Sequence, residues 1–455
     1  MDPSPIGALQ QFIGTINIDV IDPDALLDAR RFLLDAIACA FVGHTSPETP
    51  VVDGAIRQSM GGGTATVIGG TEASPAAAAA INGYLITARS LCDMHRPTLS
   101  HITPVVIPAA LAAAERIGAN GSTFLAGVVA GMETTVRLGY ALNYEEFRRR
   151  GWHTPGVAGP FGSAAAAARI GALENEQIAS ALGIAGSHAG GTFASFGTPT
   201  IKFHQARAAM AGLISADLAA HGFKGNPEIL TAKDGGILNT FTDGGDPTAI
   251  TEALGEIWRL REISTRLWPT AAALQSVVTA VLELRGSVSP RQVASIEIAL
   301  PQASYDMNAH MTWEDTFHAT LSARWVAAVT LVDGQCWLDQ FKKNRLNDDH
   351  VAALAVDRVS VVLDRSLPEG GCEVTFRMKD GRTITDLRRL PRGHPEDPTT
   401  AKETREKFHR SVAGSMDGDR ADLIIDLIDT VEQIPDMREL TALLAFRDSR
   451  DTTLV

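Results

Sequence analysis

The chain has few aromatic residues, few cysteines and no long uninterrupted hydrophobic run. Only 6% of its 455 residues are aromatic although 45% are hydrophobic, so Ala, Leu, Val and Ile must build its core. Stretches such as SPAAAAAINGYLITA are interrupted by polar residues and are too short to span a bilayer. The N-terminal sequence MDPSPIGALQQ lacks the basic and hydrophobic regions of a secretory signal. We therefore expect a cytoplasmic protein without a membrane partner.

Motifs for several common cofactors and partners are also missing. The four cysteines form no CxxC pair and have no zinc-site spacing, so Cys92 is interpreted as a small buried residue. The net charge is −13 and no run is rich in Lys or Arg, which argues against a nucleic-acid partner. The glycine clusters MGGGTATVIGG and HAGGTFASFGT match neither a P-loop nor a dinucleotide-binding turn. No cofactor and no metal are expected.

The period of the hydrophobic residues changes near residue 265. Before it, apolar residues recur at helical spacing in segments such as DPDALLDARRFLLDAIACAFVG and TPVVIPAALAAAERIGANG. Each of these segments has a Pro near its start and a Gly at its end, as helices often do. After it, QVASIEIALP alternates as a strand, CEVTFRMKDGRTITDLRR predicts a hairpin, and FHATLSARWVAAVTLVDG is helical. Beyond about residue 400 the apolar residues again follow helical spacing. The sequence predicts a large all-helical domain (1–265, completed by 400–455) with a smaller α+β domain (266–399) inserted before the C-terminal helical return.

Titratable side chains collect in three loops, each of which leads into a helix rich in small residues. The segment CDMHRPTLSH carries Asp93, Arg96 and His101, RRRGWHTPGVAGPFG carries His153, and SFGTPTIKFHQARAAMAG carries Lys202 and His204. Loops on a rigid scaffold often hold functional groups, and helix N-termini favour bound anions. Three such loops together would form an anion pocket with acid and base candidates.

Each of these side chains also has a structural explanation. A histidine near a helix start can be a cap, Lys202 a solvated lysine, and Asp93 an N-cap or turn residue. No spacing typical of a metal site joins His101, His153 and His204, so a metal is the weaker interpretation. The repetition of one layout three times favours a functional site.

The order and spacing of several segments resemble the 2-methylcitrate dehydratase (MmgE/PrpD) family, which includes cis-aconitate decarboxylase and iminodisuccinate epimerase. The resemblance is carried by ARRFLLDAIACAFVG, SHITPVVIPAALAAAE, RRRGWHTPGVAGPFGSAAAAARIGAL, FGTPTIKFHQARAAMAGLISADLAAHGFKGNPEIL, RLWPTAAALQS and GHPEDPTTAKETREKF. It implies the two-domain fold described above, a cofactor-independent enzyme, a homodimer and a small carboxylate substrate.

The resemblance also implies site residues. Catalytic roles are implied for Asp93, which would orient a histidine, for His101 and His153 as acid and base, and for Lys202. Substrate-binding roles are assigned to Arg96, His204, Arg266 and Gln275. The chain departs from the family pattern where Lys202 stands only two residues before His204, and where Arg266, Gln275 and Trp325 replace a lysine, a histidine and a tyrosine.

Three functions remain open from the sequence. The first is a lyase that dehydrates or decarboxylates its substrate next to a carboxylate, where cations must stabilise growing negative charge and a histidine must move a proton. The second is an isomerase or epimerase that uses two bases at an acidic Cα–H. The third is a family member reduced to a binding or structural role.

Overall fold

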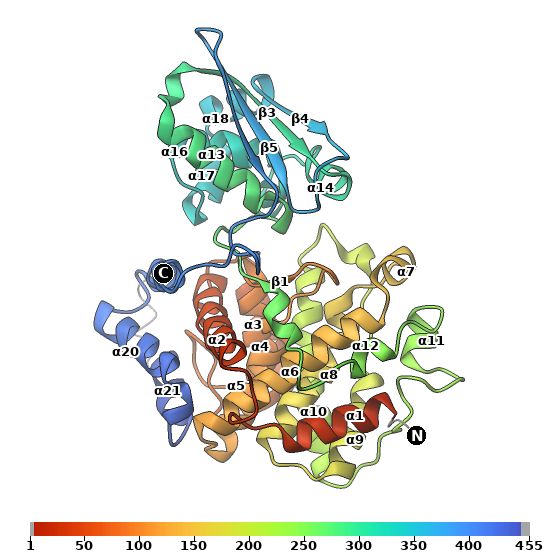
Figure 1. Ribbon diagram of the computed structural model, residues 1–455. Coiled ribbons are helices and arrows are strands. Elements are labelled where there is room, and N and C mark those ends of the chain that lie inside the picture. The colour runs from red at the N-terminus through yellow and green to blue at the C-terminus, as the bar shows by residue number, and fades with distance from the viewer. Residues whose placement is uncertain (1–3, 447–455) are drawn as a thin grey trace. The chain divides into compact units, whose positions relative to one another are not determined.

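The computed structural model describes residues 4–446, which fold into two compact units. The first unit comprises the residues up to Ile263 and those from Thr400 onward, and the second comprises Ser264–Thr399. The first is helical, and the second contains a four-stranded sheet with helices (Figure 1). The predicted fold class, a large helical domain with a smaller α+β domain, is confirmed.

The first unit is built almost entirely from helices. They are α1 (Pro5–Thr15), α2 (Pro23–Gly43), α3 (Thr49–Met60), α4 (Pro75–Ala88), α5 (Thr103–Ile117), α6 (Gly121–Ala141), α7 (Tyr144–Arg149), α8 (Thr154–Ile170), α9 (Asn175–Gly186), η1 (Phe193–Ser195), α10 (Thr200–Ala220), α11 (Ile237–Phe241), α12 (Thr248–Thr251) and η2 (Arg259–Glu262). The C-terminal return adds α19 (Ala401–Val412), α20 (Gly418–Asp429), η6 (Val431–Gln433) and α21 (Arg438–Leu444). Two short strands, β1 (Met94–His95) and β2 (Ile263–Ser264), lie outside the range in which strands were expected.

Helix α2 shows how local signals set the ends of these elements. The Asp22 carboxylate accepts hydrogen bonds from the backbone N–H groups of Asp24 and Ala25, and Pro23 occupies the first turn, where its missing N–H costs nothing. The helix ends at Gly43, as predicted. From Phe32 onward it is buried throughout, which its small and apolar residues permit.

Helices α8 and α10 pack closely because small residues face each other. A Cβ atom placed on Gly212 of α10 would lie 2.1 Å from the Cβ of Ser163 and 2.5 Å from the carbonyl oxygen of Pro160, both on α8. The two backbones therefore approach more closely than any larger residue at position 212 allows. This contact positions the N-terminal ends of both helices, which carry His153 and His204.

We expect Gly212→Ala to destabilise the protein although alanine is the better helix former. Overpacking of a tight contact typically costs about 1–3 kcal/mol. Gly54 on the exposed helix α3 is a matched control, because a Cβ there meets no atom within 4 Å. Gly54→Ala should leave stability unchanged or raise it by about 0.5–1 kcal/mol. Thermal unfolding of both variants checks this, and a rise in Tm for Gly212→Ala would contradict the close packing.

The second unit is organised around one mixed sheet with strand order β4-β3-β5-β6. Strand β3 (Val293–Leu300) pairs in parallel with β4 (Val359–Leu363) and antiparallel with β5 (Cys372–Met378), which forms a hairpin with β6 (Thr383–Arg388). The predicted strand over QVASIEIALP and the predicted hairpin are confirmed. The hairpin turns at Asp380–Gly381, where Gly381 has a φ of +88° that favours glycine.

The remaining elements of the second unit are short. They are η3 (Ala272–Leu274), α13 (Gln275–Ser287), η4 (Pro290–Gln292), α14 (Gln302–Asn308), α15 (Thr316–Leu321), α16 (Ala323–Asp333), η5 (Leu338–Phe341), α17 (Lys343–Leu346) and α18 (Asp349–Asp357). The segment predicted as helical over FHATLSARWVAAVTLVDG is two helices, because Ser322 is extended and its side chain caps α16.

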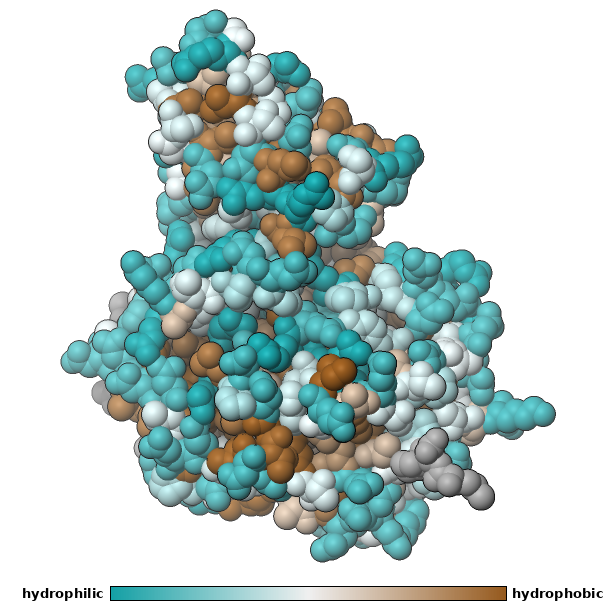
Figure 2. Space-filling view, in the orientation of Figure 1, coloured by the Kyte–Doolittle hydropathy of each residue, from teal (hydrophilic) through white to brown (hydrophobic). Residues whose placement is uncertain are grey.

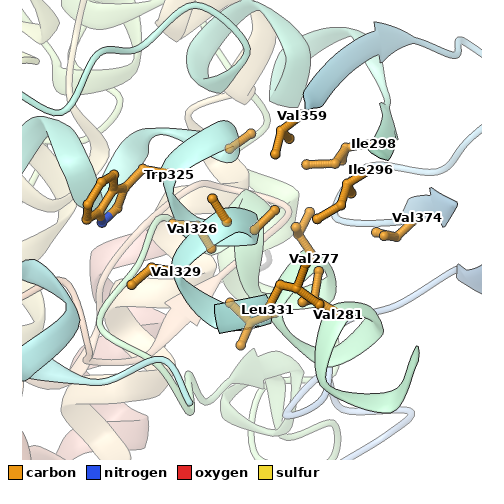
Figure 3. Packing of buried hydrophobic residues seen from close by; sticks show 14 of the residues in the cluster. Val277, Val281, Ile296, Ile298, Trp325, Val326, Val329, Leu331, Val359 and Val374 are labelled. Carbon is orange, nitrogen blue, oxygen red and sulfur yellow. The ribbon is translucent and has the colours of Figure 1, made fainter. Parts of the chain in front are cut away.

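The core of the second unit forms where α13 and α16 meet one face of the sheet. Val277 and Val281 of α13 and Val326 of α16 point toward Ile296 and Ile298 of β3 (Figure 3). Trp325 belongs to this core as well: it is fully buried, and its indole N–H donates to the carbonyl of Gln340 over 3.1 Å. Trp325 therefore acts as a packing residue in this unit.

Exposed hydrophobic side chains are scattered over the described surface. On the face shown in Figure 2, polar colours predominate and hydrophobic patches are separated from one another. Among residues 4–446, no helix combines the length and hydrophobicity that crossing a bilayer requires.

Candidate functional site

The loop that joins α4 to α5 forms hydrogen bonds within itself, and the side chain of Asp93 connects it to the start of α5. His95 and Ser100 exchange both backbone hydrogen bonds, 2.7 and 3.1 Å long. The buried carboxylate of Asp93 accepts from the N–H groups of Ile102 (2.7 Å) and Thr103 (3.1 Å) and from the Thr103 hydroxyl. The Asp93 carboxylate thus accepts hydrogen bonds from the backbone N–H groups at the start of α5, as a helix-capping residue does.

Burial strongly affects the Asp93 carboxyl group. It raises the pKa of Asp93 to about 6, and the three hydrogen bonds from Ile102 and Thr103 only partly oppose this rise. The side chain therefore bonds the start of helix α5. The carbonyl of Asp93 contacts the His101 ring, and the expected role of the Asp93 carboxylate toward a histidine stays a prediction.

The tautomer of His101 follows from its hydrogen bond. Its Nδ1 atom lies 2.7 Å from the carbonyl oxygen of Asp93, and a carbonyl can only accept, so Nδ1 carries the proton. In the neutral ring, the lone pair that can take a proton is then on Nε2. The sulfur of buried Cys92 lies 3.8 Å from the same Nδ1. His101 is not the cap of α5, because Asp93 has that role.

His153 and His204 are brought into direct contact although 51 residues separate them. His153 is the residue immediately before α8, and His204 lies in the second turn of α10. Their Nδ1 atoms are 2.9 Å apart. Both residues are buried, with exposed fractions of 7% for His153 and 8% for His204. The close packing of α8 on α10 therefore places two of the predicted site residues against each other.

Both of these histidines are held in the neutral form at neutral pH. Burial is the main cause that lowers the pKa of His153 well below its usual value, and the charges of His204, His101 and Arg148 add to it. Burial and then Arg207 lower the pKa of His204 to about 4. The electrostatic coupling between His153 and His101 shows that the three rings lie in one neighbourhood.

Two further bonds connect the loops that carry these histidines. The Thr154 hydroxyl, next to His153, donates to the carbonyl of Thr98 over 2.8 Å. The Lys202 ammonium, half-buried in the first turn of α10, donates to the carbonyl of Ala88 at the end of α4. The N-terminal ends of α8 and α10 are thus tied to the segment around residues 88–101. The structure thus links the loops of Asp93, His101, His153 and Lys202 through these contacts.

Arg96 lies in the four-residue turn between His95 and Ser100. It is half-buried, and the turn includes Leu99 with a φ of +43°, a conformation that costs free energy for a residue with a side chain. Backbone strain of this kind is often found at functional sites. The expected substrate contact of Arg96 stays a prediction.

Arg266 and Gln275 belong to the second unit, where both bond the residues between them. The Gln275 carbonyl oxygen accepts from the N–H groups of Leu267 (3.0 Å) and Trp268 (3.2 Å), and its NH₂ group donates to Thr270 Oγ1 (2.9 Å). The guanidinium of Arg266 also contacts the carbonyl of Thr270 at 3.4 Å. The Gln275 amide thus makes hydrogen bonds within its own loop, and its expected role as a substrate ligand stays a prediction.

Sequence reasoning missed a half-buried network in contact with the loop of residues 92–101. The Glu262 carboxylate accepts from the Tyr140 hydroxyl, pairs with Arg259 at 2.8 Å and lies 3.5 Å from Nε2 of His95. Although burial alone would raise it, the bonds from His95, Tyr140 and Arg259 lower the pKa of Glu262 to about 2. The partners are 122 and 167 residues apart, so no local sequence pattern reveals them.

A second missed contact connects the C-terminal return to this loop. The Lys407 ammonium on α19 lies 2.5 Å from the Asp35 carboxylate of α2 and 3.0 Å from the carbonyl of Leu91, two residues before Asp93. Both side chains are almost completely buried. Lysine and aspartate are rarely buried unless they are paired, but sequence alone does not show the pairing.

Comparison with known proteins agrees with this architecture. The MmgE/PrpD N-terminal domain model matches residues 7–249, and the MmgE/PrpD C-terminal domain model matches residues 268–433. The chain is 32% identical to the "cis-aconitate decarboxylase-like protein oryM" of Aspergillus oryzae, over 93% of this chain and 94% of the relative. It is 29% identical to cis-aconitate decarboxylase of Aspergillus terreus (94% and 93%) and 26% identical to that of Homo sapiens (91% and 89%). The chain therefore belongs to the MmgE/PrpD family.

Proposed function

We propose that this protein is a lyase that removes CO₂ from a small unsaturated polycarboxylate, with cis-aconitate as the first substrate to test. The observation that carries the proposal is the contact between His153 and His204, tied through Thr154 to the loop of His101, in a chain similar to decarboxylases over more than nine-tenths of its length. The relatives are 26–32% identical to this chain, and the test of the proposal is a direct assay of the substrate.

The chemistry of such a substrate defines what the site must supply. In cis-aconitate one carboxylate is attached to a CH₂ group next to the carbon–carbon double bond. When its C–C bond breaks, the electron pair forms a new double bond, and the electrons of the old double bond take up a proton at the far carbon. CO₂ leaves and one proton is added. The protein must therefore hold the remaining carboxylates and deliver a proton.

The residues of the first unit fit these two tasks. His101 has its Nδ1 proton fixed on the Asp93 carbonyl, so Nε2 is the atom that would accept a proton from solvent and deliver it. A bound carboxylate favours the protonated imidazole by Coulomb attraction. Lys202 supplies a cation, and the positive ends of the α8 and α10 helix dipoles favour anions. Cofactor independence and a homodimeric state remain part of this proposal.

Purified full-length protein should release CO₂ from cis-aconitate, and release it more slowly from the trans isomer, whose carboxylates point differently. Citrate serves as the matched hydroxylated compound. New alkene absorbance from citrate without CO₂ would instead identify a dehydratase, and solvent deuterium exchange without either product would identify an epimerase. No reaction with any of these or related di- and tricarboxylates would refute the lyase assignment and leave a binding role.

A further inference from the structure

The contact between His153 and His204 restricts where protons can be. Two imidazole nitrogens 2.9 Å apart cannot both be bare, because their lone pairs repel, and cannot both carry hydrogen, because the hydrogens would collide. One proton therefore lies between the two Nδ1 atoms. In a neutral pair, the ring that donates has a bare Nε2, and the ring that accepts has an Nε2–H.

The backbone around the pair packs closely against it and is held by hydrogen bonds. Gly191, with a φ of +125°, lies so close to His204 that a Cβ atom there would be 2.9 Å from its Nδ1. The carbonyl of Gly191 accepts from the backbone N–H of His153 at 3.0 Å. Arg207, one turn after His204, donates to the carbonyls of Gly156 (3.0 Å) and Gly190 (2.5 Å). Hydrogen bonds thus connect the segment of Gly190 and Gly191 to the start of α8 and to α10.

The surroundings oppose a positive charge on His153 more than on His204. His153 is the more strongly affected ring: burial, His204, His101 and Arg148 all disfavour its charged form. The Phe193 ring centroid lies 6.0 Å from that of His153, and the guanidinium of Arg148 lies 3.5 Å from the Phe193 centroid. Burial and then the charge of Arg207 lower the pKa of His204 to about 4, so fewer groups oppose its charged form than oppose that of His153. An extra proton on the pair therefore belongs on His204.

We propose that His204 is a positioning residue that fixes the tautomer of His153 and takes over its Nδ1 proton whenever His153 receives a proton at Nε2. This inference rests on the proposed function, and it adds to the proton delivery by His101 a second proton-transfer role at His153, the role that the family resemblance implies for that residue. The geometry of the pair stands independently of the reaction.

The proton balance of this relay is simple. In the resting pair, His153 carries Nδ1–H and a bare Nε2, and His204 carries Nε2–H. A proton arrives at Nε2 of His153, and the Nδ1 proton of His153 moves across to Nδ1 of His204. His153 is then neutral with its proton on Nε2, and His204 is the imidazolium. Delivery of the Nε2 proton to substrate reverses both movements, so one net proton is transferred.

The relay can be tested without any substrate by NMR of full-length protein with ¹⁵N-labelled histidine side chains. Expected is a solvent-shielded imidazole N–H signal that disappears in both His153→Phe and His204→Phe. His221→Gln is the matched control, because His221 lies exposed at the other end of α10 and bonds only its own helix. Persistence of the signal in both ring variants, or independent titration of the two rings near pH 6.5, would overturn the pair.

Kinetics separate a relay from a purely structural role. Asparagine at position 204 places an amide oxygen near the former Nδ1, so His204→Asn keeps an acceptor for His153 but cannot be protonated. We expect kcat to fall about 10- to 100-fold with little change in KM, less than the loss from removing a proton-transferring group itself. The dependence of kcat on the D₂O fraction should be curved in the wild-type protein and linear in the variant. A curve that stays unchanged would contradict the relay, whereas absence of any turnover in the wild-type protein would contradict the proposed function and leave the NMR result standing.

Discussion

Replacement of His101 by asparagine is expected to lower kcat by about 100- to 10,000-fold, the usual contribution of a positioned proton-transfer group. Asparagine can still donate to the Asp93 carbonyl from near the position of Nδ1, so the loop should keep its conformation. It has no nitrogen that accepts a proton, so delivery to the substrate should fail. KM should change little, because the groups that hold the carboxylates remain.

Melting temperature must be measured together with the rate. Because Asp93 and not His101 satisfies the start of α5, the Tm of His101→Asn should equal that of the wild-type protein. His409→Asn, on the exposed face of α19, controls for the loss of an imidazole elsewhere. Activity of His101→Asn within about threefold of the wild-type rate would end the assignment of His101 to proton transfer.

Replacement of Lys407 by methionine is expected to reduce the free energy of unfolding by about 3–5 kcal/mol, because it leaves the Asp35 carboxylate buried without its cation. A loss of this size is a large part of the stability of a typical domain, which is about 5–15 kcal/mol. The free Leu91 carbonyl adds to the penalty, since Lys407 also donates to it. Urea denaturation with two probes would measure the change.

Three further variants separate charge from packing at Lys407. Lys402→Met on the same helix is the control, because that side chain is 84% exposed and should change stability by less than about 0.5 kcal/mol. Lys407→Arg keeps the charge and allows folding to be checked if the methionine variant expresses poorly. Combining Lys407→Met with Asp35→Asn should restore part of the loss, since the uncompensated charge is gone. Equal losses in the double and single variants would argue that packing, not charge, dominates.

The local signals of the sequence predicted much of the secondary structure correctly. The Asp22 cap and Gly43 bounded α2, alternating Ile296, Ile298 and Leu300 identified β3, and Asp380–Gly381 marked the hairpin turn. These features depend on neighbours within a few residues. Strand β4 was not foreseen, because its pairing with β3 depends on residues more than sixty positions away.

The candidate site was predicted less completely, because its geometry depends on distant contacts. Sequence placed His101 and His153 before helices but could not show that His204 shares a proton with His153. It also predicted a role of Asp93 toward a histidine, but it could not show that the Asp93 carboxylate accepts from backbone N–H groups nine and ten residues later. Lys407 and Asp35 are 372 residues apart, so no periodic pattern in the sequence indicates that they pair.

The most direct test of the proposed lyase is to incubate the full-length protein with cis-aconitate in D₂O and follow the reaction by NMR. The account predicts release of CO₂ and formation of an unsaturated five-carbon dicarboxylate that carries one deuterium, at a rate that falls at least about a hundredfold in His101→Asn. Unchanged substrate, or deuterium exchange into cis-aconitate without loss of CO₂, would contradict it.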